Sequence, residues 1–267
     1  MSWTRVRRAV IGLVAASVLY VLAAELGRGR LPDRIWLGAH YVENVQLLPT
    51  WRSLLEEGTF LIQSNILVES VVVSTRRVVL GLLLGSIAGI LLGLLTGAAS
   101  RLEALADPWV TFFRFTPALA LLPLYVVWFG YGESSKVLLI ATNVAVITFL
   151  GAHHGVRGVP RVYLDAAAAL GADRWLQFRK VILPAAFPSI LASIRVATGL
   201  AWVTIVVAEL INAQMPSLGY LLALAGAYPR VPNMLIGLAT VGALVLVFDL
   251  LALLLHAWGT RWMERAA

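Results

Sequence analysis

The sequence predicts an all-α integral membrane protein with six transmembrane helices and with both termini on the inner side of the membrane. Its 267 residues are 60% hydrophobic and only 13% charged, and the mean hydropathy is +0.86. A single soluble core of this size cannot bury so large an apolar fraction, so the solvent for much of the chain is a lipid bilayer. Several apolar runs are also long enough to span a bilayer.

The composition excludes several function classes. The chain has no cysteine, which removes disulfide scaffolds, cysteine-containing zinc sites and cysteine nucleophiles. The net charge of +7 does not indicate nucleic acid, because basic residues of membrane proteins gather on cytoplasmic segments that face anionic lipid. His153 and His154 are adjacent, so they diverge on a helix instead of forming the i, i+4 pair that binds a metal. We therefore expect no metal site, no bound cofactor and no nucleic-acid partner.

The N-terminal region, 1–65, is expected to hold one transmembrane helix and an external linker. Three arginines precede an apolar run over 9–24, which can form a spanning helix. A cleaved signal peptide is the alternative, but the rest of the chain is itself polytopic, which favours an uncleaved helix. Residues 25–65 mix charged residues, prolines and tryptophans, and Thr50 can cap a short amphipathic helix over 51–57.

The C-terminal region, 66–267, is expected to form a core of five transmembrane helices. The first of them, 71–98, carries a stripe of glycines at every fourth position: Gly81, Gly85, Gly89, Gly93 and Gly97. Small residues at this spacing let a second helix approach backbone to backbone. We therefore predict that the stripe packs against another helix, with a substrate-lining stripe as the alternative.

The other four spans of this region are predicted over 109–129, 137–151, 188–211 and 234–258. The first of them contains Pro117 and Pro123, so we predict a bent or broken helix, which is tolerated where it is buried or lines a cavity. A short loop with Arg101 and Glu103 precedes this span. A polar connection with several prolines and glycines separates the last two spans.

The distribution of lysine and arginine sets the expected orientation. If the N-terminus lies inside, the inner segments hold more of these residues than the outer segments, and many of the inner ones fall within 157–180. Positive residues accumulate on the cytoplasmic side of membrane proteins. The excess therefore favours an arrangement with both termini in the cytoplasm.

One charged stretch, 165–184, is expected to form a cytoplasmic loop between the fourth and fifth spans. Pro160 can begin a short helix, Gly171 supplies a left-handed stop, and Asp173 can cap a second helix that ends toward Pro184. The alanines of the first helix leave a smooth surface that fits a groove on another protein. An ordinary cytoplasmic hairpin of two helices is the alternative.

The spacing in this loop resembles the EAA motif of the integral membrane subunits of ATP-driven importers. In that motif an acidic residue and two alanines precede a glycine at a fixed interval, and a Leu-Pro pair follows. The counterparts in this sequence are Asp165, Ala166, Ala167, Gly171, Ala172, Leu183 and Pro184. The sequence departs from the motif where aspartate replaces the usual glutamate and where Val181 replaces the usual isoleucine.

Three further stretches, 74–81, 114–132 and 201–220, resemble the permeases of the nitrate, sulfonate, taurine and bicarbonate importer group, with related importers of thiamine-precursor pyrimidines as the alternative. The resemblance covers about 48–262. It implies the type I fold of ABC importer transmembrane domains, in a multi-pass subunit of the bacterial inner membrane that dimerises with a second copy. It also implies two cytoplasmic ATPase subunits that bind ATP and magnesium and dock on Asp165–Gly171 within the coupling loop, 156–186, and an external solute-binding protein.

The chain itself carries no recognisable ATPase site. A phosphate-binding loop needs a glycine-rich turn that ends in Gly-Lys-Ser or Gly-Lys-Thr after a strand, and neither Lys136 nor Lys180 has that context. We therefore expect a transport subunit and not an enzyme. A secondary transporter should show inverted repeats and an intramembrane enzyme should show a catalytic set, so both are weaker alternatives. The composition alone is also compatible with a channel, which is a further alternative.

Ionisable residues within the spans need partners, because a charge at the bilayer centre costs about 2.5 to 3.5 kcal/mol on the insertion scale. Arg195 and Asp249 lie at comparable depths in the last two spans, so we predict an ion pair, either structural or part of the pathway. Glu209 lies near the depth of Arg76 and Arg77, and we expect a contact there as well.

The candidate translocation-path residues are Arg114, Pro117 and Glu209. Arg114 precedes the break expected at Pro117 and can offer a cation to an anionic solute near the middle of the membrane. The alternative for Arg114 is that its side chain extends to the membrane interface or forms an ion pair.

Overall fold

The computed structural model describes residues 34–37, 40–43, 49–212, 214–228 and 230–264. The first predicted spanning helix, 9–24, therefore lies outside the described residues. Within them the chain is helical apart from one antiparallel hairpin in the expected linker, formed by β1 (Arg34–Leu37) and β2 (His40–Glu43). This hairpin is an exception to the predicted all-α fold.

The linker also contains α2 (Trp51–Gln63), which begins as predicted behind Thr50. The Thr50 hydroxyl accepts a hydrogen bond from Ser53 N at 3.2 Å and so satisfies one of the free N–H groups at the start of the helix. The helix runs about two turns beyond the predicted end, until Asn65 adopts a left-handed conformation with φ of 59°.

Four helices of the described chain are long and apolar enough to cross a membrane. They are α3 (Ile66–Ala98), α6 (Glu133–Arg157), α9 (Leu183–Ile211) and α11 (Val231–Glu264). A bent pair makes a fifth candidate span: α4 (Ser100–Phe115) is followed, after a turn of 97°, by a 3-10 turn and α5 (Leu122–Phe129). The described residues therefore hold four or five candidate spans.

The bend confirms the break predicted at Pro117 and corrects the start of this span. Thr116 is extended with φ of −80° and ψ of 123°, because proline excludes the helical conformation from the residue before it. The predicted loop with Arg101 and Glu103 is wrong, since α4 already begins at Ser100. The first turns of α4 are amphipathic and contain no long apolar run. A search for apolar runs therefore placed the start of this helix too late.

A second correction concerns the connection between α9 and α11, which contains α10 (Leu218–Ala227) instead of only polar loop. Ser217 caps this helix, and its hydroxyl accepts a hydrogen bond from Tyr220 N at 3.2 Å. The prolines of this connection flank the apolar residues and do not interrupt them, which is why a helix can form. Ten residues are too short to cross a membrane.

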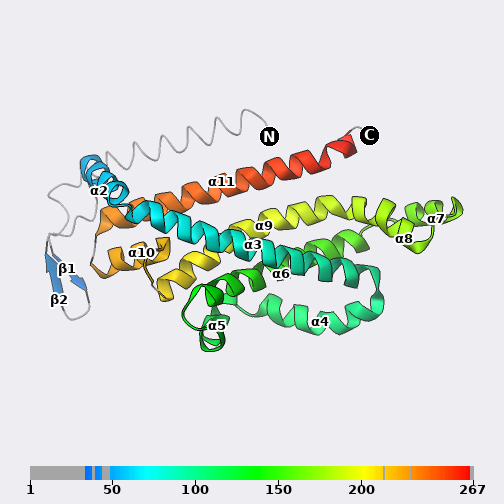
Figure 1. The fold of residues 1–267 in the computed structure, drawn as a ribbon, viewed down its shortest axis with the longest axis horizontal. Helices are drawn as coiled ribbons and strands as arrows, with labels where there is room; N and C mark the ends of the chain where they lie inside the picture. The colour runs from blue at the N-terminus through cyan, green and yellow to red at the C-terminus, as the bar shows by residue number, and fades with distance from the viewer. Residues whose placement is uncertain (1–33, 38–39, 44–48, 213, 229, 265–267) are drawn as a thin grey trace.

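Helix α6 is central in the described chain and α11 is peripheral. Figure 1 shows α3 beside α6 and α9, with α11 along the outer side of α9. Half of the most apolar part of α6 is buried, compared with 6% for α11. The largest buried cluster joins α3, α6, α9 and α10 through Val78, Ile140, Val144, Ala197, Ala201, Trp202, Ile205 and Leu218.

The glycine stripe of α3 faces α6 along its whole length. All five glycines are buried, and a Cβ added at any of them would lie within 3.0 Å of an α6 atom. The α6 residues that lie nearest to such a Cβ are Ile140, Ala141, Thr148, Phe149 and Val156, in order from Gly81 to Gly97. The stripe therefore lets the two backbones approach more closely than any larger residue would allow.

We predict that Gly89→Ala destabilises the protein by about 1 to 3 kcal/mol, the usual penalty of overpacking, because the new methyl group would overlap Ala145 and Thr148. Gly199→Ala on α9 is the matched control, since its Cβ would enter open space. Thermal unfolding of the purified protein in detergent, followed by circular dichroism, measures the difference. Equal unfolding midpoints for the two variants would contradict the packing role.

Candidate functional site

The predicted coupling loop is a projecting hairpin of two short helices beyond the ends of α6 and α9 (Figure 1). The first helix, α7 (Arg161–Ala169), is followed two residues later by Gly171, which has the predicted left-handed conformation with φ of +83°. Ala172 N donates to Ala167 O at 3.0 Å and Gly171 N donates to Ala168 O at 2.9 Å. This pair of bonds satisfies the last carbonyls of α7 and fixes a tight turn at the tip.

The second helix of the hairpin, α8 (Arg174–Gln177), is capped by Asp173, as predicted. Asp173 Oδ1 accepts a hydrogen bond from Leu176 N at 2.8 Å. The predicted end near Pro184 is wrong, because the chain stays helical from Arg174 to Ile211.

A wide turn, η2 (Phe178–Ile182), explains this continuity. Leu183 N donates to Phe178 O, five residues back, which is the hydrogen-bond pattern of a π-helix. Proline lacks an N–H and clashes with the carbonyl four residues before it in a regular helix. The wide turn changes the geometry at this point, so Pro184 can occupy the first turn of α9 without ending the helix.

The tip of the hairpin exposes motif residues together with large apolar side chains. Asp165, Ala166 and Gly171 are exposed, Ala167 and Ala172 are half-buried, and Leu183 and Pro184 lie half-buried at the base. The apolar side chain of Leu170 at the tip is 89% exposed. Exposed apolar groups gathered on a projecting helix are typical of a surface that contacts another protein.

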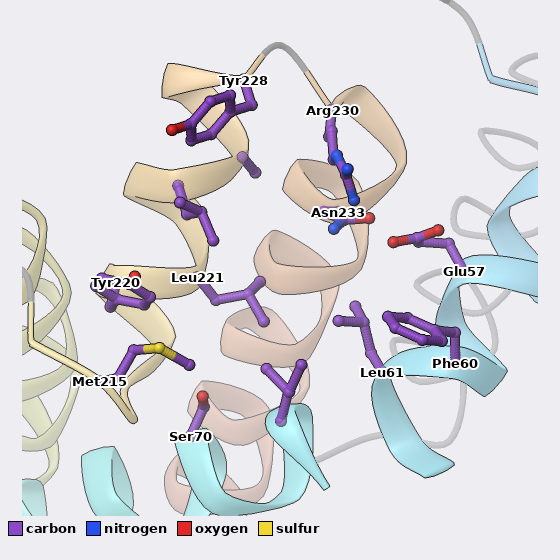
Figure 2. Close-up of a pocket in the computed structure, with 13 residues that line it drawn as sticks. Glu57, Phe60, Leu61, Ser70, Met215, Tyr220, Leu221, Tyr228, Arg230 and Asn233 are labelled. Atoms are coloured by element: carbon purple, nitrogen blue, oxygen red, sulfur yellow. The ribbon is translucent and has the colours of Figure 1, made fainter. Parts of the chain in front are cut away.

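A cavity of about 320 Å³, which the sequence did not predict, lies between α2, α3, α10 and α11 (Figure 2). Apolar side chains such as Leu61 and Leu221 form its walls. Figure 2 shows Ser70 at one end and Arg230 with Asn233 at the other. Its residues come from four separate segments, so no local pattern in the sequence could have indicated it.

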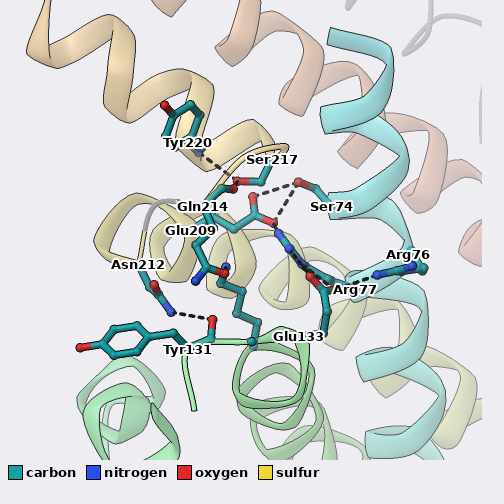
Figure 3. A network of polar contacts seen from close by, with 12 residues as sticks. Ser74, Arg76, Arg77, Tyr131, Glu133, Glu209, Asn212, Gln214, Ser217 and Tyr220 are labelled. Atoms are coloured by element: carbon teal, nitrogen blue, oxygen red, sulfur yellow. Dashed lines mark hydrogen bonds and ion pairs between the residues drawn. The ribbon is translucent and has the colours of Figure 1, made fainter. Parts of the chain in front are cut away.

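A buried polar network joins α3, α9 and α10 around Glu209 (Figure 3). Glu209 is fully buried and accepts hydrogen bonds from Ser74 Oγ at 2.9 Å, Arg77 Nη1 at 2.7 Å and Gly219 N at 3.0 Å. Ser74 Oγ also accepts a bond from Leu218 N at 3.1 Å. The carboxylate is therefore satisfied within the chain, as a buried charge requires.

The network extends to the first turn of α6. Arg77, which is 3% exposed, also pairs with Glu133, and Arg76 pairs with Glu133 at 3.0 Å. The expected contact of Glu209 is therefore present for Arg77 but not for Arg76. Lys136 is fully buried nearby, with Nζ 3.4 Å from Gln214 Oε1. Glu133 was not predicted from the sequence, although an acidic residue in the first turn of a helix is a usable signal.

The placement of Glu209 bears on its expected role in the translocation path. That role stays a prediction, and the complete burial of the carboxylate favours a structural function instead. We call the four residues Ser74, Arg77, Glu133 and Glu209 the Glu209 network.

Arg195 and Asp249 lie together across α9 and α11, at the contact that their depths suggested. Arg195 Nε donates to Asp249 Oδ1 at 2.6 Å and Nη2 donates to Oδ2 at 2.8 Å, which is a bidentate pair. The two side chains are 41% and 44% exposed in the described chain, so the pair lies at the surface where α11 meets α9. Whether it is structural or part of the pathway stays a prediction.

Arg114 lies beside the bend at Pro117, and both residues are exposed. The guanidinium carbon is 4.7 Å from the centre of the Phe115 ring, and Arg114 forms no ion pair in the part of the chain that the structure describes. It lines a cavity of about 260 Å³ together with polar side chains from α4 and α6, among them Asp107 and His154. Arg114 therefore keeps free donors for an anion, and its role in the path stays a prediction.

No group of three or more His, Cys, Asp or Glu side chains that could hold a metal ion occurs among the residues described in Figure 1.

Comparison with known proteins gives a consistent assignment. Residues 81–265 match the family model described as "Binding-protein-dependent transport system inner membrane component". A probable ABC transporter permease protein of Brucella abortus is 36% identical over 244 residues, which cover 90% of this chain and 97% of that protein. The taurine transport system permease protein TauC of Escherichia coli is 36% identical over 177 residues, or 66% of this chain and 64% of TauC.

A solved structure shows the same fold. A chain of the MetNI methionine ABC transporter, captured in inward-facing conformations, aligns with a TM-score of 0.66 at 19% identity. The alignment covers 73% of this chain and 97% of that chain. At this level of identity the likeness concerns the fold alone.

We predict that Glu209→Ala destabilises the protein by about 3 to 5 kcal/mol, because it leaves Arg77 buried with one partner fewer and removes the acceptor for Gly219 N. Glu56→Ala is the control, since it breaks the exposed pair with Arg52 and should change stability by less than about 1 kcal/mol. Thermal unfolding in lipid nanodiscs measures both variants. A loss for Glu209→Ala no larger than for Glu56→Ala would show that the network contributes little to stability.

Proposed function

This chain belongs to the family of binding-protein-dependent transport system inner membrane components, and we propose that it forms the translocation path for a small anionic solute of the sulfonate, taurine or bicarbonate type. The match of the family model to residues 81–265 carries the proposal. In this family a separate subunit hydrolyses ATP, so the chain is a transport subunit and not an enzyme. Arg114, which forms no ion pair among the described residues, lies beside the bend at Pro117 and agrees with an anionic solute.

The proposed assembly contains two copies of this chain, two cytoplasmic ATPase subunits and an external solute-binding protein, in the bacterial inner membrane. Each copy has six spans with both termini inside, of which 1–65 supplies the first and an external linker, and 66–267 supplies the other five. ATP and magnesium bind to the ATPase subunits. The loop over 156–186 faces the cytoplasm.

Helix α7 is the proposed contact with the ATPase. Its motif alanines and the exposed Leu170 offer a small, partly apolar surface that projects beyond the spans. The helix from Arg174 to Ile211 begins with α8, the second helix of the hairpin, and has no break, so a force on the hairpin acts on α9 as a whole. Closure of the ATPase pair on ATP binding then changes which side of the membrane the path faces.

The proposal is tested by transport in proteoliposomes that contain the permease, its ATPase and its binding protein. We expect uptake of radiolabelled taurine or bicarbonate that requires ATP and the binding protein. Uptake without ATP would indicate a secondary transporter or a channel instead. ATP-dependent uptake of a thiamine-precursor pyrimidine, with no uptake of the anions, would replace the proposed solute class.

The coupling role predicts that Ala166→Arg weakens binding of the ATPase at least about tenfold, the effect of about 1.4 kcal/mol, because a long side chain replaces the smooth surface of α7. Co-purification of the tagged ATPase measures it. Thr59→Arg on α2 is the control, since it adds the same side chain at an exposed helical position far from the hairpin. Normal ATPase recruitment by Ala166→Arg would rule out this surface of α7 as the docking site.

A further inference from the structure

A groove of about 660 Å³ lies where the C-terminal ends of α3 and α6 meet the coupling hairpin. Its walls are mostly apolar and come from the last turns of both spans and from the hairpin: Leu94, Leu95, Val156, Val159, Leu164 and Ile182. Trp175, which is 67% exposed, stands at its edge. Because α3 and α6 are candidate spans that end here, the groove lies at the level where the membrane interior meets water.

The rim of the groove is basic. Arg157, Arg161 and Arg174 line it, and among the residues that the structure describes no aspartate or glutamate does. Arg157 pairs with Glu103, whereas Arg161 and Arg174 form no ion pair within the described ranges of the chain. Two arginines with free donors therefore stand beside an apolar wall, and this combination fits a ligand that has an anionic head and an apolar body.

The groove lies on the opposite side of α7 from its most exposed surface. Arg161 and Leu164 face the groove, and they share one side of the helix because they are three residues apart. Ala166 and Leu170 do not line the groove, and at 100° per residue they project from the other side. A protein that docks on Ala166 and Leu170 therefore leaves the groove open toward the membrane.

We propose that this groove binds an anionic phospholipid of the cytoplasmic leaflet. The phosphate contacts the guanidinium groups of Arg161 and Arg174, and an acyl chain follows the apolar wall formed by the ends of α3 and α6. Basic pockets between membrane helices on the cytoplasmic side bind anionic headgroups in this way. The inference rests on the proposed function, which places the hairpin in the cytoplasm. The bound lipid would tie α7 to the spans and so make coupling depend on anionic lipid.

A small anion or an acidic partner fits the groove less well. Inorganic phosphate would use the arginines but leave the apolar wall in contact with water. An acidic segment of the ATPase would pair with the arginines but would place its polar groups against the apolar wall. The phospholipid satisfies both parts of the surface.

The test measures lipid retained by the complex of permease and ATPase after it is purified in detergent from membranes of phosphatidylethanolamine and phosphatidylglycerol. Mass spectrometry of the extracted lipid gives the amount of phosphatidylglycerol per complex. We expect Arg161→Gln with Arg174→Gln to lower tight retention about tenfold, as a loss of about 1.4 kcal/mol would. Arg179→Gln with Lys180→Gln is the matched control, because it removes the same charge from exposed residues that do not line the groove.

A second variant tests the apolar wall without changing charge. Leu164→Trp fills the groove and should lower retention of phosphatidylglycerol as well, while the unfolding midpoint shows that the variant is folded. Equal losses of phosphatidylglycerol in the Arg161→Gln, Arg174→Gln variant and in the control variant would overturn the proposal. The lipid would then be attracted by the overall positive charge and not by the groove. Displacement of the lipid by inorganic phosphate would also overturn it, since the site would then recognise the anion alone.

ATPase co-purification in the same samples separates this inference from the proposed function. If the groove variant loses the ATPase but keeps phosphatidylglycerol, the groove belongs to the ATPase contact and the lipid proposal is wrong. If Ala166→Arg does not reduce ATPase binding, the proposed docking surface is wrong. If retention of phosphatidylglycerol still depends on Arg161 and Arg174 in that complex, the lipid site is supported independently.

Discussion

The close contact between the backbones of α3 and α6 is the constraint on which the rest of the structure depends. Within lipid there is no hydrophobic drive between two apolar helices, so association relies on packing. Five glycines provide that packing, and a side chain at any of them would overlap α6. With α3 in place, α6 becomes the central helix, and α9 packs against it through residues such as Ala197 and Trp202.

Charge is handled differently at the two ends of this core. At one end the Glu209 network satisfies charged groups within the chain and links α3 and α9 to the first turn of α6, and the hydrogen bond from Gly219 N to Glu209 adds α10. At the other end the hairpin around Gly171 projects, and Arg161 and Arg174 form no ion pair with any other described residue. One continuous helix, Arg174–Ile211, joins the two, since it begins behind Asp173 and contains Glu209 near its far end. A displacement of the hairpin is therefore transmitted along one helix to the contacts around Glu209.

Local features were the ones that sequence could predict. The helix cap at Asp173, the left-handed Gly171 and the break at Pro117 each follow from the conformational limits of one residue, and each is present. The contact of Arg195 with Asp249 followed from depth, because a charge in a membrane needs a partner. The helix α10 and the continuous helix past Pro184 were not predicted. The prolines of the connection lie outside α10, and the wide turn Phe178–Ile182 accommodates Pro184 within a helix.

The sequence by itself determined the membrane class, the family resemblance, the glycine stripe and the coupling motif, because these depend on composition and on spacing along the chain. Only the tertiary structure decided that the stripe meets α6, that Glu133 joins Glu209 through Arg77, and that Arg161 and Arg174 border one apolar groove. These features bring together residues from helices far apart in the chain. A periodic pattern defines which face of a helix is special, but the packing of the helices defines what that face meets.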